Sequence, residues 1–162
     1  MTDTPRPGSP AGNPSASPRD ARPASPATSP TTVAEWRAAA AGTLFERMEI
    51  EVDHVAADLV SGHMPVAGNT QPAGLLHGGA SVVLAESLGS IAAQLHAGPG
   101  RDAVGIEVNA THHRGVRAGV VHGEARALHL GRTTAVYEIV VTDDDGRRVC
   151  TARLTCMILQ RA

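Results

Sequence analysis

The chain has 162 residues, of which 42% are hydrophobic and 2% aromatic, with 14 basic against 16 acidic side chains. This length fits one globular domain, and the near balance of charge excludes a protein that binds nucleic acid through a strongly basic surface. One Trp, one Tyr and one Phe are too few rings for a base-stacking platform. We therefore expect no nucleic-acid partner.

Neither a membrane span nor an export signal is indicated by the sequence. No window approaches 18 consecutive apolar residues, and the first residues lack the basic-then-apolar order of a secretory signal. We expect a cytoplasmic protein without a membrane partner. Cys150 and Cys156 lie in one predicted strand, which separates them by about 20 Å and excludes a disulfide between them. We expect two buried thiols.

The first 32 residues differ in composition from the rest of the chain. They hold eight of the eleven prolines, mixed with Ser, Thr, Ala and Gly. Such a segment cannot bury enough apolar area to offset the entropy lost on ordering. The sequence predicts a disordered tail over 1–32, with a Pro-rich docking segment as the alternative, and a folded domain over 33–162.

The folded part begins with a short helix and two strands. An Ala-rich stretch over 33–41, with Thr31 or Thr32 as its cap, predicts the helix. Apolar residues that alternate with acidic ones predict a strand over 48–55, and a second extended segment covers 58–66.

One long helix and four further strands follow. Residues 78–97 contain no proline, place apolar residues at helical spacing and end at Gly98. Alternating patterns predict strands over 104–111 and 119–128, and a hairpin around the turn 143–146. If the last four strands pair in antiparallel succession, the result is an α+β domain with one sheet packed on one helix. The expected buried face of the hairpin contains Ala135, Tyr137, Ile139 and Val141, then Cys150, Ala152, Leu154, Cys156 and Ile158.

The long helix carries two distinct faces. The stripe expected to pack on the sheet contains Leu84, Leu88, Ile91 and Leu95. Glu86 and Ser90 form an i, i+4 pair on another side. A lone carboxylate in so apolar a run makes Glu86 a candidate catalytic residue, and the alternative is a solvated side chain on an exposed helix face.

The start of the same helix is a second candidate site. His77-Gly78-Gly79 places glycines in the first turn, where backbone N–H groups are unpaired and the helix dipole favours negative charge. Such a group suits the oxyanion of acyl transfer, and the alternative is an ordinary tight helix entry. Gly78 and Glu86 are eight residues apart, about 12 Å along the axis, too far to contact one carbonyl. A shared site needs Glu86 from a second chain, whose helix runs antiparallel under two-fold symmetry.

Two segments, residues 71–80 and 84–90, resemble the hotdog-fold acyl-CoA thioesterases of the PaaI-like superfamily. The resemblance covers about 57–159 and includes the stretches 104–114 and 128–132. It is closest to the branch with the 1,4-dihydroxy-2-naphthoyl-CoA thioesterase of menaquinone biosynthesis and the 4-hydroxybenzoyl-CoA thioesterase that uses a glutamate. A related branch has aspartate at the position of Glu86.

The resemblance implies a hotdog fold, with an antiparallel sheet wrapped around one long central helix, and a homodimer or dimer of dimers. It implies that Glu86 is the nucleophile or general base, that Ser90 positions it, and that the Gly78 N–H polarises the thioester carbonyl across the dimer interface. His77 would shape the helix start, and Gln71 would contact the thioester. The implied CoA-binding residues are Gly105, His112, His113, Arg114, Gly115, His129, Leu130, Gly131, Arg132, Thr133 and Thr134.

The expected reaction is hydrolysis of an aromatic or bulky acyl-CoA to the free acid and CoA, without a cofactor or metal. Adjacent His112 and His113 would point to opposite faces of a strand, and the sequence contains no H-E-x-x-H, C-x-x-C or G-x-S-x-G motif. One alternative is an acyl-CoA-binding hotdog module without catalysis. Another is a hotdog dehydratase, which needs a histidine paired with an acid, whereas His77 has no nearby aspartate.

Overall fold

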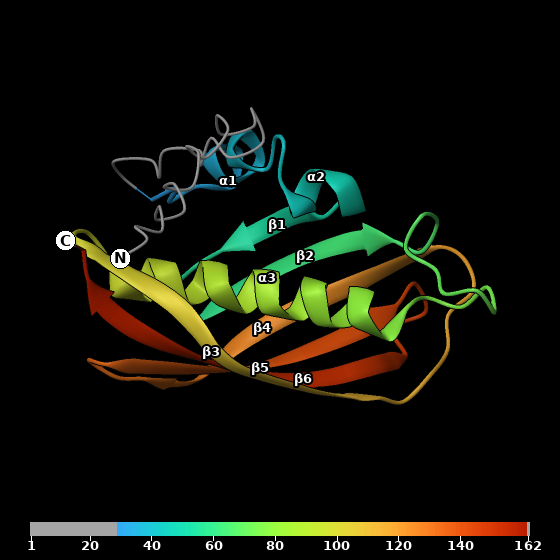
Figure 1. Ribbon diagram of the computed structural model, residues 1–162. Coiled ribbons are helices and arrows are strands. Elements are labelled where there is room, and N and C mark those ends of the chain that lie inside the picture. The colour runs from blue at the N-terminus through green and yellow to red at the C-terminus, as the bar shows by residue number, and fades with distance from the viewer. Residues whose placement is uncertain (1–28, 162) are drawn as a thin grey trace, which may run out of the picture.

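The computed structural model describes residues 29–161, so almost all of the predicted tail and its docking alternative lie outside the described residues. Six antiparallel strands form one sheet that curves around the long helix α3 (Figure 1). The elements are α1 (Val33–Ala39), α2 (Leu44–Met48), β1 (Glu51–Val55), β2 (Leu59–Pro65), α3 (Gly78–Ala97), β3 (Arg101–His112), β4 (Val120–Leu130), β5 (Thr134–Asp143) and β6 (Arg148–Gln160). The fold is α+β with the hotdog arrangement, as predicted.

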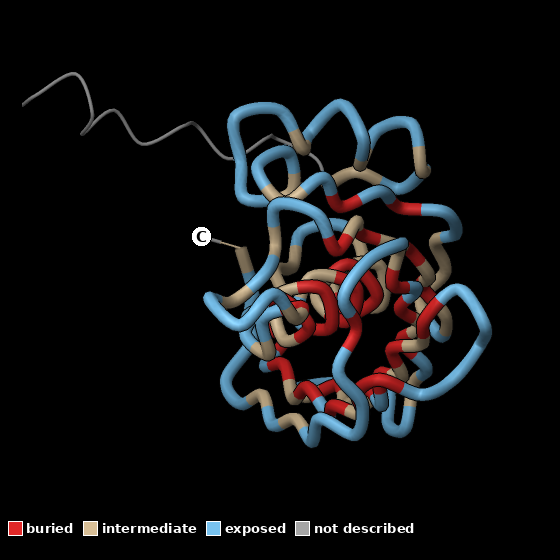
Figure 2. The backbone as a smooth tube through the Cα atoms, turned by 90° about the vertical axis from the view of Figure 1, so that its right-hand side faces the viewer, coloured by how far each residue is buried: buried red, intermediate tan, exposed pale blue. Residues whose placement is uncertain are grey.

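Helix α3 forms where it was predicted and fills the concave face of the sheet. Leu84, Leu88 and Ile91 are fully buried, whereas Leu95 at the end of the stripe is only partly buried. Glycines allow the close approach: a Cβ on Gly123 of β4 would lie 2.6 Å from Leu88 Cδ1. Figure 2 shows the buried positions gathered around this helix and the inner side of the sheet, with exposed loops outside them.

The β5–β6 hairpin also agrees with its prediction. The Asp143 carboxylate accepts hydrogen bonds from the backbone N–H groups of Asp145 (3.1 Å) and Arg147 (2.9 Å), which closes the turn. Both cysteines lie buried and unbridged on the inner face, as expected.

The predicted pairing of the last four strands is wrong for β3. The sheet order is β1-β2-β4-β5-β6-β3, so β3 pairs with β6 and lies at an edge, and it does not contact β4 as a neighbouring strand. Gln94 of α3 helps to hold β3 there, because its Nε2 donates to Arg101 O (3.0 Å) and its Oε1 accepts from Ala103 N (2.9 Å). This side-chain pairing is not visible in the strand pattern.

The alternating apolar residues that predicted the strand over 104–111 do not share one face of β3. A register shift between Gly105 and Glu107 changes the side on which the apolar residues lie. Val104 pairs with the exposed Met157 and is 42% exposed, while Val108 beyond the shift is partly buried against the core. The alternation of apolar residues was real, but the bulge divides it between two faces.

The strand predicted from residue 48 begins later, because a helix precedes it. Thr43 caps α2 by accepting a hydrogen bond from the Phe45 N–H (3.3 Å). The helix ends at Met48, its C-cap Glu49 has a φ of 55° in the left-handed region, and β1 then starts at Glu51. The alternation that predicted a strand over 48–55 therefore belongs partly to a helix end, where local capping determines the conformation.

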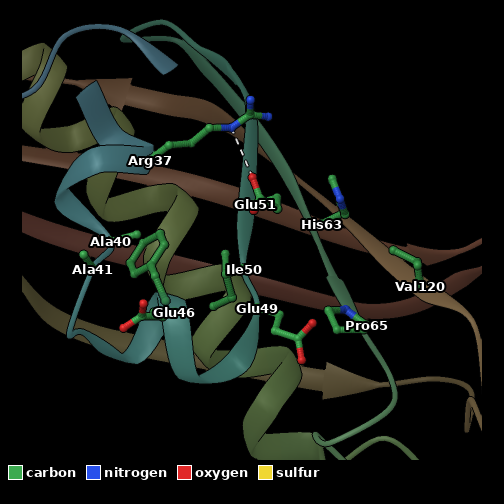
Figure 3. Close-up of a pocket in the computed structure, with 11 residues that line it drawn as sticks. Arg37, Ala40, Ala41, Glu46, Glu49, Ile50, Glu51, His63, Pro65 and Val120 are labelled. Atoms are coloured by element: carbon green, nitrogen blue, oxygen red, sulfur yellow. Dashed lines mark ion pairs between the residues drawn. The ribbon is translucent and has the colours of Figure 1, made fainter. Parts of the chain in front are cut away.

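Helices α1 and α2 form a cap (residues 33–48) beside β1. Thr32 and Glu35 make a capping box at the start of α1, which agrees with the predicted helix. Arg37 links the cap to β1 through an ion pair with Glu51 (3.1 Å) and a hydrogen bond to Val52 O (3.3 Å) (Figure 3). The groove in Figure 3, of about 490 Å³, lies between the cap and β1–β2 and contains none of the predicted site residues.

Candidate active site

Glu86 lies on the exposed side of α3, next to the edge strand β3. A Cβ on Gly105 would be 3.6 Å from Glu86 Oε1, so these two predicted site residues are neighbours. Within residues 29–161, no group forms a hydrogen bond or ion pair with the Glu86 carboxylate. The carboxylate is therefore able to accept a proton or to attack an electrophile.

A cavity of about 420 Å³ opens in front of Glu86, a volume within the usual range for ligand pockets. Its polar side is formed by four residues of α3, Glu86, Ser87, Ser90 and Gln94. Its apolar walls come from α3, β3 and the cap, through Trp36, Leu44, Phe45, Val83, Ile91 and Ala103. This arrangement places one carboxylate, two hydroxyl groups and one amide against an apolar chamber.

Cys156 lies on the inner face of β6, near Glu86. Burial and, secondarily, the charge of Glu86 raise the pKa of Cys156 to about 11. At neutral pH this thiol is protonated, and a protonated thiol is a poor nucleophile. The nearby cysteine therefore does not compete with Glu86 for a catalytic role.

Gly78 lies at the start of α3, where the structure leaves its N–H available. His77 is the N-cap, and its Nδ1 accepts a hydrogen bond from Gly79 N at 2.9 Å. Among the described residues, nothing accepts the Gly78 N–H. The first turn of α3 contains no acidic side chain, so no carboxylate of this turn offsets the positive end of the helix dipole.

A second cavity, of about 340 Å³, adjoins this helix start. Gln71 and Gly78 line this cavity together. Four of the predicted CoA-binding residues also line it, namely His112, His113, Arg114 and Gly115. The His112 ring covers Gly78 so closely that a Cβ at this position would lie 2.9 Å from His112 Nε2. Only glycine fits there without a shift of the histidine, which was not evident from the sequence.

The loop before α3 holds Gln71 beside this cavity. The Gln71 N–H donates to Leu75 O and the Gly74 N–H donates to Gln71 O, both at 2.8 Å. These bonds make a tight turn, and Gly74 adopts a φ of 74° within it. The turn fixes the backbone of Gln71 near the start of α3.

The remaining predicted CoA-binding residues lie at the other end of α3. His96, in the last turn of the helix, contacts Gly131 O through Nε2 at 2.8 Å. The turn that contains Gly131 closes with a bond from its N–H to Thr134 O (2.9 Å). None of the residues His129, Leu130, Gly131, Arg132, Thr133 and Thr134 lines either of the two cavities described above.

One chain therefore divides the predicted site into separate parts. Glu86 and Ser90 line one cavity, and Gln71 and Gly78 line another. Residues 129–134 lie near His96, 18 residues along α3 from Gly78, or about 27 Å. The two groups of predicted CoA-binding residues, 112–115 and 129–134, therefore lie near opposite ends of α3.

Comparisons with known proteins agree with this architecture. Residues 73–150 match the family model of the thioesterase superfamily. The proofreading thioesterase EntH of Klebsiella pneumoniae subsp. pneumoniae is 49% identical over 129 residues, which cover 79% of this chain and 94% of that protein. The chain belongs to the thioesterase superfamily.

Solved structures of other thioesterases have the same fold. A variant of thioesterase PA1618 from Pseudomonas aeruginosa is 43% identical, with a TM-score of 0.77, and covers 80% of this chain and 94% of that one. Thioesterase SAV0944 from Staphylococcus aureus is 32% identical, with a TM-score of 0.69, over 72% of this chain and 98% of that one. This member of the superfamily is accordingly a thioester hydrolase with a hotdog fold.

Several residues of the candidate site could not be predicted as such from the sequence. Trp36, Leu44 and Phe45 line the Glu86 cavity, although they precede the segment that matches the family model. The spacing of Val33 and Trp36 on one face of α1 was a usable signal, since both are partly buried against the core. Gln94 had no comparable signal, because its role depends on where β3 lies.

Two further findings concern metals and membranes. Within residues 29–161, no group of three or more His, Cys, Asp or Glu side chains is arranged to hold a metal ion. The same residues contain no helix that is long and apolar enough to cross a membrane.

Proposed function

We propose that this thioesterase hydrolyses an acyl-CoA with an aromatic or bulky acyl group to the free acid and CoA. The observation that carries the proposal is the unpaired Glu86 carboxylate at the polar side of an apolar-walled cavity. Apolar walls suit a hydrophobic acyl group, and the carboxylate supplies the reactive group that hydrolysis needs.

In the proposed reaction, Glu86 takes a proton from a water molecule that attacks the thioester carbonyl carbon, or attacks that carbon itself to form an anhydride that water then hydrolyses. The Gly78 N–H donates to the carbonyl oxygen as it becomes negatively charged. The C–S bond breaks and CoA leaves as a thiolate, which then takes up a proton. Because a thiolate leaves readily, we propose that no cofactor or metal takes part.

We propose that Ser90 and Gln71 position the reacting groups. Ser90 lies one turn from Glu86 on the same side of α3 and lines the same cavity, so its hydroxyl is placed to orient the carboxylate or the water. Gln71 lies with Gly78 in the other cavity and would contact the thioester there. Variants of SAV0944 replace a glutamine and a glutamate 15 positions apart, the spacing of Gln71 and Glu86 here.

We propose a homodimer in which Glu86 acts with Gln71 and Gly78 of the other chain. The spacing along α3, about 12 Å, keeps the two groups apart within one chain. A two-fold axis that places two α3 helices antiparallel would bring each Glu86 to the partner's helix start. Arg114 and Arg132 are exposed, and we propose that both groups of CoA-binding residues contact CoA, with arginine binding its phosphates. A dimer of dimers is a further expectation.

The names of the relatives bear on the biological role. The Klebsiella relative is a proofreading thioesterase, which favours, as a second candidate, removal of acyl groups that do not belong on a thiol carrier. The relatives described above give no support to a role in menaquinone biosynthesis. Similar kcat/KM values across unrelated aroyl-CoAs would favour proofreading, whereas one strongly preferred substrate would favour a dedicated biosynthetic step.

The decisive experiment measures CoA release with a thiol reagent for wild type, Glu86→Gln and a control variant, Glu138→Gln, whose carboxylate is exposed on the outer face of β5. We expect Glu86→Gln to lower kcat/KM for benzoyl-CoA by about 10²–10⁴-fold, and the control to retain wild-type activity. A wild-type protein that binds acyl-CoA and hydrolyses none of a broad panel would instead support the binding module.

Label on Glu86 after a single turnover in ¹⁸O-labelled water would identify Glu86 as the nucleophile. If Glu86 activates water, the label enters the product acid in the first turnover. If Glu86 attacks the carbonyl and water then attacks the Glu86 carboxyl carbon of the anhydride, the first acid released contains an oxygen from the enzyme, and the label appears on Glu86. Water attack at the acyl carbon of the anhydride would instead give the labelled acid.

A further inference from the structure

The cap contributes a wall to the cavity that contains Glu86. Trp36 comes from α1, and Leu44 and Phe45 come from α2, while Glu86 and Ser90 lie on α3. Two of the three aromatic residues in the whole chain, Trp36 and Phe45, are therefore gathered at this one cavity. Aromatic rings provide large, flat surfaces that stack on other rings.

The cap is held to the rest of the domain by few buried contacts. Neither α1 nor α2 contains a fully buried residue. The ion pair between Arg37 and Glu51 is about half exposed on both sides, and pairs of this kind contribute little to stability. Trp36 and Phe45 are only partly buried against the core, which leaves part of their surface for the cavity.

Trp36 has a feature that packing alone does not explain. Its Nε1 is enclosed and forms no hydrogen bond with any group among residues 29–161. A buried donor without an acceptor destabilises the folded state, so a phenyl ring would serve a purely structural position better. The large indole at this position is more easily explained by its contact with the cavity.

We propose that Trp36 and Phe45 determine which acyl groups reach Glu86, with their rings forming the wall against which an aromatic acyl group packs. They are specificity-determining residues that do not take part in the chemical step. This inference rests on the proposed function, because it assumes that the cavity beside Glu86 holds the acyl group of the substrate. In this inference the cap sets the acyl preference, although it lies outside the segment matched by the family model.

The test compares kcat/KM for acetyl-CoA, benzoyl-CoA and 1-naphthoyl-CoA in wild type and in Trp36→Ala, Trp36→Phe and Phe45→Ala. For Trp36→Ala and Phe45→Ala we expect the ratio of kcat/KM for 1-naphthoyl-CoA to that for benzoyl-CoA to rise by about tenfold or more, because the wall recedes. Trp36→Phe keeps an aromatic wall, so its ratio should change less. Val33→Ala is the matched control, since Val33 lies on the same helix but does not line the cavity.

The outcomes separate this inference from the proposed function. If both alanine variants lower kcat/KM for all three substrates by the same factor, or leave all of them unchanged, the cap does not select the acyl group. That result overturns the inference while Glu86-dependent hydrolysis still supports the proposed function. If Trp36→Ala does not fold, as judged by its circular dichroism, the ratios for Phe45→Ala and Trp36→Phe decide. If Glu86→Gln leaves hydrolysis intact, the proposed function itself fails.

Discussion

Complementation between two inactive variants tests whether the active site needs two chains. Gln71→Ala removes a group from the cavity at the helix start, and Glu86→Ala removes the carboxylate from the other cavity. Each variant alone should lose about 10²-fold or more in kcat. In a mixed dimer, one site combines Glu86 of the first chain with Gln71 of the second, and the other site lacks both groups. Random exchange makes half of the dimers mixed, each with one intact site of two, so activity should recover to about a quarter of wild type.

The assay measures CoA release after the two variants are co-refolded, and again after they are mixed without unfolding. Glu86→Ala co-refolded with Glu86→Gln is the control, which should show no recovery because no chain supplies the carboxylate. If the mixture of Gln71→Ala and Glu86→Ala is no more active than the average of the two, both groups act within one chain. In that case the separation of about 12 Å along α3 does not describe the working site.

Three further predictions concern stability, each measured by urea unfolding. Leu88→Ala should lower the free energy of unfolding by about 2–5 kcal/mol, because Leu88 is fully buried. Leu128 is 61% exposed, so Leu128→Ala should change the free energy of unfolding by no more than about 0.5 kcal/mol. Trp36→Phe should be neutral within about 1 kcal/mol, because removal of the unpaired N–H offsets the lost packing. Burial alone would raise the pKa of Asp143, but hydrogen bonds from Arg147 and Asp145 lower it overall. The ionised Asp143 carboxylate therefore stabilises the fold above about pH 4, and this contribution is lost as the pH falls further. In Asp143→Asn the free energy of unfolding should fall less steeply between neutral and acidic pH than in wild type. An equally steep fall in the variant would contradict this.

Local signals in the sequence were sufficient for the parts of the fold that depend on neighbours in the chain. The long helix has the predicted bounds because its apolar spacing, its capping residue and Gly98 all lie within one segment. The hairpin was predictable for the same reason, since its turn and both strands are contiguous. The position of β3 was not predictable, because it depends on pairing with β6 about 50 residues away and on the side chain of Gln94.

For the candidate site, too, the features formed by neighbouring residues were predictable, and those formed by distant segments were not. Glu86 and Gly78 stood out because a carboxylate in an apolar helix and glycines at a helix start are visible in a short window. The aromatic wall from the cap was missed, because the spacing of Val33 and Trp36 indicates that α1 packs on the core but not that it lies opposite Glu86. The separation of residues 112–115 from 129–134 also required the fold, since it depends on which end of α3 each segment reaches.

One dimer arrangement would account both for the exposed edge strand β3 and for the separation of Glu86 from Gly78 within one chain. The edge strand β1 is short and is hydrogen-bonded by Arg37 of the cap, whereas the other edge strand, β3, is 12 residues long and exposes Val104 and Ile106. A long apolar edge is a site where strands add, and native proteins cover such edges. Antiparallel addition of a second β3 would cover this edge and would place two α3 helices side by side in opposite directions. In that orientation Glu86 of each chain would meet the partner's helix start, so the proposed homodimer would cover the exposed edge and complete the candidate site through the same contact.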